Sequence, residues 1–160
     1  MAPTYRQRLR VEGLVLASCG AIGTLATLPL AAQATRGPAS TIGQLVAVAV
    51  LLAWLGPRSA RRAMQRSQPL SLTGVGSGEP TPLWQLPLIV VVLSVPVGLL
   101  GGWDAGLRVT AGCVLVGIAQ ALLLERAVAA EERTSGRRYF RVAGSRILRG
   151  TNLGHVPPRG

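Results

Sequence analysis

Four long apolar segments, at residues 13–34, 39–57, 82–102 and 105–124, contain one charged residue between them, Arg108 near the start of the fourth. A helix that rises about 1.5 Å per residue needs about 20 residues to cross roughly 30 Å of hydrocarbon. The segments therefore have the length and composition of transmembrane helices. Together they take up about half of the 160 residues, which leaves no room for a sizeable soluble domain.

We predict an all-α integral membrane protein in which four transmembrane helices form two hairpins. Residues 1–124 make up the membrane domain, and residues 125–160 form an arginine-rich cytoplasmic tail. Residues 68–82, rich in proline and glycine, are predicted to be a flexible linker between the hairpins. The glycine spacing in this linker is not that of a phosphate-binding loop, because the chain has no lysine and prolines follow at once.

The arginines indicate how the chain crosses the membrane. All 17 basic residues are arginines, and they are concentrated before the first segment, between the second and third, and after the fourth. Because cytoplasmic loops carry an excess of basic residues, we expect both termini in the cytoplasm. A composition rich in Arg, Ala and Gly favours a bacterial cytoplasmic membrane. The same arginines favour contact with anionic lipids, and binding of nucleic acid is not expected.

Two processing signals overlap the first segment. Residues 32–34 read Ala-Gln-Ala, which resembles a signal-peptidase site, and residues 16–19 have the form of a lipobox. The apolar segment is longer than a typical signal sequence, and apolar residues continue past Cys19 where a lipoprotein would begin its soluble domain. We expect the first segment to be retained as a membrane span.

Reactive side chains are sparse. Cys19 and Cys113 are far apart and form no Cys-x-x-Cys pair, and His155 is the only histidine. One histidine cannot build a zinc site or ligate a haem on both faces. No ionisable residue lies deep in a span, where a coupled transporter would need one. We therefore expect a protein that is not an enzyme and binds no cofactor or metal.

Small residues recur every three or four positions in each segment, which is the pattern of close helix packing in lipid. The second segment has Gly43 and Ala47, and the first has Ala17 and Gly20. A stripe that finds no partner within one bundle would be a contact with another subunit or another copy. The helix-packing positions predicted in the third and fourth segments are Gly98, Gly102, Gly106, Gly117 and Ala121.

The tail contains a basic and aromatic segment at residues 137–149. Wound as a helix, it would place its aromatic residues on one face and its arginines on the other, which suits the membrane surface. The residues predicted to contact lipid or a partner are Arg137, Arg138, Tyr139, Phe140, Arg141 and Arg149.

These patterns lead to one functional hypothesis with two alternatives. The first is a non-enzymatic accessory or scaffold subunit of a larger membrane assembly, joined to other membrane subunits or to its own copies through small-residue helix faces and the basic tail. The alternatives are a small homo-oligomeric passive channel or transporter, and a pore former of the holin type.

Overall fold

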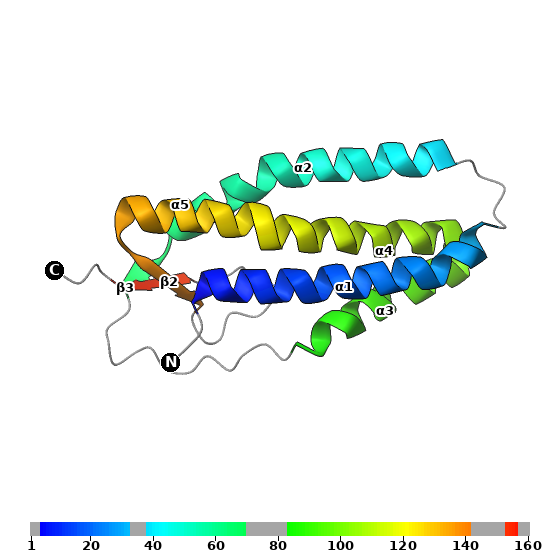
Figure 1. The fold of residues 1–160 in the computed structure, drawn as a ribbon, viewed down its shortest axis with the longest axis horizontal. Helices are drawn as coiled ribbons and strands as arrows, with labels where there is room; N and C mark the ends of the chain where they lie inside the picture. Colours follow the sequence, from blue (N-terminus) through cyan, green and yellow to red (C-terminus); the bar gives the residue numbers. More distant parts are fainter. Residues whose placement is uncertain (1–3, 33–37, 70–82, 142–152, 157–160) are drawn as a thin grey trace.

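The computed structural model describes residues 4–32, 38–69, 83–141 and 153–156. Within them, four helices run side by side and a small sheet closes one end (Figure 1). The helices are α1 (Tyr5–Ala31), α2 (Pro38–Gln65), α3 (Gln85–Gly101) and a long one that begins as α4 (Trp103–Ile118). Three of them are long and apolar enough to cross a membrane. The prediction of a helical membrane protein with several spans is confirmed.

Helix α3 is the exception in length. It is apolar but has 17 residues, so it rises about 25 Å. Figure 1 shows it running obliquely beside α1 and α4, on the half of the bundle away from the sheet. Gly102, with φ of 90°, ends α3 and begins α4 in a single residue. A positive φ is open to glycine at little cost, so this residue permits the sharp reversal.

The fourth helix continues far beyond its predicted end. Helix α4 passes through a π-helical segment, Ala119–Leu124, into α5 (Glu125–Ser135), which gives one helix of 33 residues. At 1.5 Å per residue it is about 50 Å long, more than the hydrocarbon of a membrane requires. It ends at Gly136, which adopts the left-handed conformation and donates its N–H to the Glu132 carbonyl. Helix α1 also begins early, at a Thr4–Gln7 capping box.

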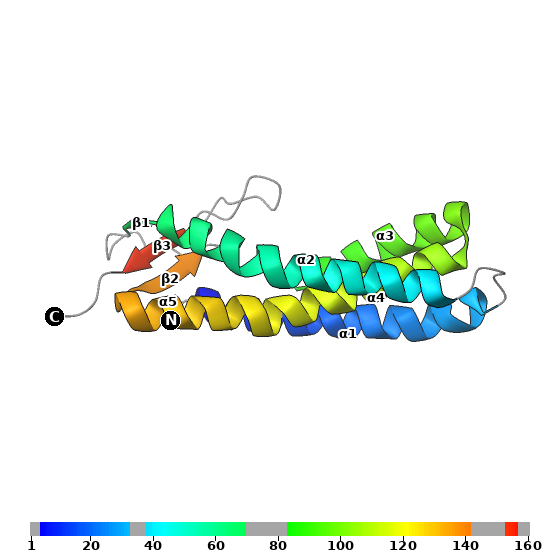
Figure 2. The ribbon, with the colours of Figure 1, turned by 90° about the horizontal axis from the view of Figure 1, so that it is seen from above.

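The projecting helix ends carry a small core outside the apolar segments. Tyr5 and Leu9 of α1 pack with Met64 of α2 and Val128 of α5. Tyr139 and Leu153 complete the cluster from two strands, β2 (Arg138–Arg141) and β3 (Leu153–Val156). Figure 2 shows the strands beside the ends of α2 and α5. This cluster lies beyond the apolar stretches of the helices, and we call it, with the strands beside it, the extramembrane end.

The sheet corrects the prediction for the tail. Its strand order is β1–β3–β2, with β1 (Gln68–Pro69) parallel and β2 antiparallel to β3. The expected amphipathic helix over 137–149 is wrong at residues 138–141, which are extended. In a strand, neighbouring side chains point to opposite faces, and Tyr139 is buried whereas Phe140 is half-exposed. Residues 142–149, the glycine-rich part of the linker and the Ala-Gln-Ala signal beyond Ala32 lie outside the described residues.

Candidate functional site

Helices α1 and α4 cross with their backbones in direct contact. A Cβ placed on Gly117 would lie 2.5 Å from the carbonyl oxygen of Gly13 and 2.5 Å from the amide nitrogen of Ala17. One placed on Gly20 would lie 2.8 Å from the amide nitrogen of Val114. Only glycine permits these approaches, because real Cβ atoms essentially never lie within 3.0 Å of such atoms. The small residues of α1 and α4 are therefore used within the chain.

Helices α3 and α4 form a second close contact nearer the turn. A Cβ on Gly106 would lie 3.2 Å from the Gly98 Cα and 3.4 Å from the Ser94 carbonyl oxygen. The Trp103 ring covers Gly98, at 2.9 Å from a Cβ placed there. Gly106 and Gly98 thus lie where α3 and α4 approach each other. Gly102 forms the turn between these two helices.

One polar contact joins the two best-packed helices. The Thr24 hydroxyl lies 2.8 Å from the Gly20 carbonyl oxygen and 3.2 Å from the Thr110 hydroxyl oxygen, and it can donate its one proton to either. Thr110 is 1% exposed and also bonds the Leu107 carbonyl at 3.0 Å. Both hydroxyls therefore have partners inside the bundle, as buried polar groups in a membrane require.

Helix α2 is packed quite differently from the others. None of the residues in its most apolar stretch is buried, and it contacts the bundle mainly through the long helix that runs from α4 into α5. A Cβ on Gly43 would meet nothing within 4 Å. The adjacent Gln44 is exposed and makes no hydrogen bond to the residues that the structure describes. Ala47, one turn further, is exposed as well. The small-residue stripe of α2 is the one left open among the described helices.

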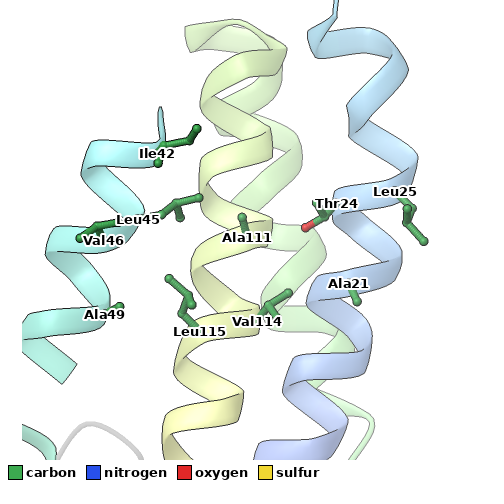
Figure 3. Close-up of a pocket in the computed structure, with 10 residues that line it drawn as sticks. All are labelled: Ala21, Thr24, Leu25, Ile42, Leu45, Val46, Ala49, Ala111, Val114 and Leu115. Atoms are coloured by element: carbon green, nitrogen blue, oxygen red, sulfur yellow. The ribbon is translucent and has the colours of Figure 1, made fainter. Parts of the chain in front are cut away.

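A groove separates the first part of α2 from α1 and α4. It has a volume of about 610 Å³ and lies between the three helices (Figure 3). Leu45 of α2 and Leu115 of α4 project into it. Its lining is apolar except for Thr24, whose hydroxyl is already bonded. The lining residues are Ala21, Thr24, Leu25, Ile42, Leu45, Val46, Ala49, Ala111, Val114 and Leu115.

The predicted tail residues occupy different environments. Tyr139 is 2% exposed and packs in the extramembrane core, and its backbone N–H donates to the Glu132 carboxylate at 3.3 Å. Arg137 and Arg138 are exposed, and Phe140 is half-buried beside them. Arg141 ends β2, and Arg149 lies outside the described residues. Tyr139 is thus a core residue rather than a residue free to enter a lipid surface.

Two polar pairs hold the extramembrane end together. Arg6 of α1 forms an ion pair with Glu125, where α5 begins. Ser67 Oγ lies 3.0 Å from Nδ1 of His155, and the His155 ring packs near Tyr139 at 6.4 Å between centroids. Within the described ranges no three His, Cys, Asp or Glu side chains group as metal ligands would. Cys19 and Cys113 are free thiols.

The sequence did not reveal two of the important positions. Gly13 was placed at the start of a span, yet it faces Gly117 and Ala121 in the tightest part of the bundle. The i+4 and i+7 spacing from Gly13 to Ala17 and Gly20 was the available signal. Gln44 has no hydrogen-bond partner among the described residues because of the position of α2 in the bundle. No local sequence pattern indicates that position.

Comparisons with known protein families, characterised proteins and solved structures find no match to this chain. The class of protein to which this chain belongs therefore rests on its own structure. Its apolar helices mark it as a membrane protein with several spans, and its open polar and small-residue surface lies on α2.

Proposed function

We propose that this protein is a non-enzymatic accessory subunit of a larger membrane assembly, and that α2 is the helix that binds the partner. The partner would supply a transmembrane helix with a small-residue face and a polar side chain opposite Gln44. The observation that carries the proposal is the contrast between Gly13 and Gly20 of α1, which are in backbone contact with another helix, and Gly43, which is in open space.

The physical basis is the way in which helices associate in lipid. Apolar side chains gain little by leaving lipid, so association depends on close packing and on hydrogen bonds between helices. Gly43 and Ala47 would let a second helix approach closely along α2. Gln44 could then exchange hydrogen bonds with that helix, at about 0.6 to 2 kcal/mol for each bond. The exposed Val50 and Trp54 leave room for a contact along the helix.

We further propose that both termini lie in the cytoplasm of a bacterial cell, with the chain crossing the plasma membrane four times as two hairpins. The extramembrane end then faces the cytoplasm. Arginines on α1, α2 and α5 surround it, and Arg58 stacks on Trp54 at 4.2 Å from the ring centroid. An anionic leaflet attracts such residues by about 1 kcal/mol each near its surface, so this end would rest against lipid headgroups or a partner's acidic surface.

The test is purification of the tagged full chain from its native membranes in a mild detergent, followed by mass spectrometry. The wild type should retain a membrane protein in stoichiometric amount. Gly43→Leu should lose that protein, because the added side chain blocks close approach to α2. Gln44→Leu should weaken its retention.

Gly112→Leu is the matched control. Gly112 is also a glycine in a membrane helix with nothing within 4 Å of its Cβ position, but it lies on α4. It should retain the partner. A wild type that purifies alone as a monomer, or loss of the partner in both leucine variants, would contradict the proposal. Conductance by the purified protein in liposomes, or lysis of cells on induced expression, would favour the channel or holin hypothesis instead.

A further inference from the structure

The groove between α1, α2 and α4 has a function that does not depend on the partner of α2. We infer that it is a binding site for one acyl chain of a membrane phospholipid, whose phosphate group lies at Arg108. The phospholipid comes from the leaflet at the Gly102 turn, because the groove residues lie in the half of the helices nearest that turn.

The first argument is the chemistry of the lining. Nine of the ten lining side chains are aliphatic, and the hydroxyl of the tenth, Thr24, lies within hydrogen-bond distance of the Gly20 carbonyl oxygen and the Thr110 hydroxyl. No lining side chain therefore needs a hydrogen-bond partner from the occupant. A hydrocarbon chain satisfies such a surface, whereas the backbone of a loop or a column of water would leave polar groups unpaired.

The second argument is size. The groove volume of about 610 Å³ is within the roughly 300–1,000 Å³ of small-molecule sites. A transmembrane helix about 10 Å across and about 30 Å long occupies on the order of 2,000 Å³. A partner helix would therefore not enter between α2 and the α1–α4 pair unless α2 moved away. A flexible chain one methylene wide fits without such a movement.

The third argument is a charged residue on α4, one turn before the first α4 residue that lines the groove. Arg108 precedes Ala111 and Leu115 by three and seven residues, so all three lie along one side of α4. Its guanidinium donates to Asp104 at 2.9 Å, and its side chain is still 24% exposed. Its Nε is buried without an acceptor among the described residues. A phosphate oxygen beside the exposed part of this guanidinium would share it with Asp104 and give its accessible N–H groups a further acceptor.

The decisive measurement uses the purified full chain in nanodiscs that contain a phosphatidylglycerol with a photoreactive group in one acyl chain. After irradiation, digestion and mass spectrometry locate the labelled residues. We expect labelling concentrated at 42–49 and 111–115, with competition by excess unlabelled phosphatidylglycerol. Uniform labelling of all lipid-facing helix surfaces without competition would overturn the inference. So would equal labelling of the groove residues Leu45 and Ala49 and of the exposed Gly43 and Ala47 on the same helix.

A pair of variants adds an independent test. Ala49→Trp fills the groove, and Leu51→Trp places the same side chain on the opposite, exposed face of α2. Native mass spectrometry should show one retained phospholipid on the wild type and on Leu51→Trp, and at least a fivefold lower retained fraction on Ala49→Trp. Equal retention by both variants would contradict the site. Arg108→Gln should reduce retention while leaving the helical circular dichroism unchanged. If Ala49→Trp does not fold, the labelling map of the wild type decides.

Discussion

Gly13 and Gly117, from the first and last membrane helices, lie so close that neither has space for a side chain. A Cβ on Gly13 would be 2.6 Å from the Gly117 carbonyl oxygen, and a Cβ on Gly117 would be 2.5 Å from the Gly13 carbonyl oxygen. The contact is reciprocal, so it fixes the α1–α4 distance from both sides. It joins helices that are distant in the chain, and the rest of the bundle is arranged around this pair.

Replacing Gly117 by leucine should destabilise the bundle strongly. The added side chain must push α1 away from α4, and overpacking of this kind costs about 1–3 kcal/mol or more. We expect a lower midpoint of unfolding in mixed micelles as the fraction of denaturing detergent rises. Gly112→Leu is the control, because that position is open, and its midpoint should stay within error of the wild type. Equal losses in both variants would show that leucine at any α4 glycine is harmful.

The Thr24–Thr110 contact should have a small, measurable coupling energy. Interhelical hydrogen bonds in membranes average about 0.6 kcal/mol in double-mutant cycles. Thr24→Val and Thr110→Val should therefore be non-additive by about that amount in the unfolding free energy. Thr27 bonds only carbonyls of its own helix, so the cycle of Thr27→Val with Thr110→Val should be additive. Coupling of equal size in both cycles would argue against a direct bond.

Much of this structure could be predicted from local sequence patterns, and the remainder depends on contacts between distant segments. Apolar length predicted the three helices that are long enough to cross a membrane, and Gly98, Gly106 and Gly117, which small-residue spacing singled out, lie in close contacts between helices. The extramembrane core could not be read in this way. Tyr139 is buried because β2 pairs with β3 and packs against α1 and α5, so the helical pattern gave the wrong conformation at residues 138–141.

The ion pair between Arg6 and Glu125 should stabilise the extramembrane end modestly. The residues are 119 positions apart, and their side chains are 47% and 15% exposed. A partly exposed pair is screened by solvent, so its coupling should be about 0.5 kcal/mol. Arg6→Gln and Glu125→Gln in a double-mutant cycle should show that coupling in 50 mM salt and lose most of it in 1 M salt, where the Debye length falls to about 3 Å. Coupling unaffected by salt would indicate packing rather than charge.

Tyr139 and Phe140 provide the sharpest test of the extended tail segment. Tyr139 is 2% exposed in the extramembrane core, whereas Phe140 is half-buried on the other face of β2. Tyr139→Ala should remove a large buried side chain, at a cost of about 3–5 kcal/mol for aromatic residues in cores. We expect faster amide hydrogen exchange in β2, β3 and the last turns of α2, with exchange in the apolar part of α4 unchanged.

Phe140→Ala is the matched control for that variant, because it removes an aromatic ring from the adjacent residue. Since neighbouring residues of a strand face opposite sides, its effect on exchange in β3 should be much smaller. In an amphipathic helix over 137–149 the two rings would share one face, and both variants would expose the same surface. Similar acceleration by both alanines would therefore favour the helix, whereas a large effect of Tyr139→Ala alone would establish the strand. In each variant, the amide exchange rate in β3 is compared with the rates elsewhere in the same protein. The result therefore does not depend on the absolute stability of the membrane helices.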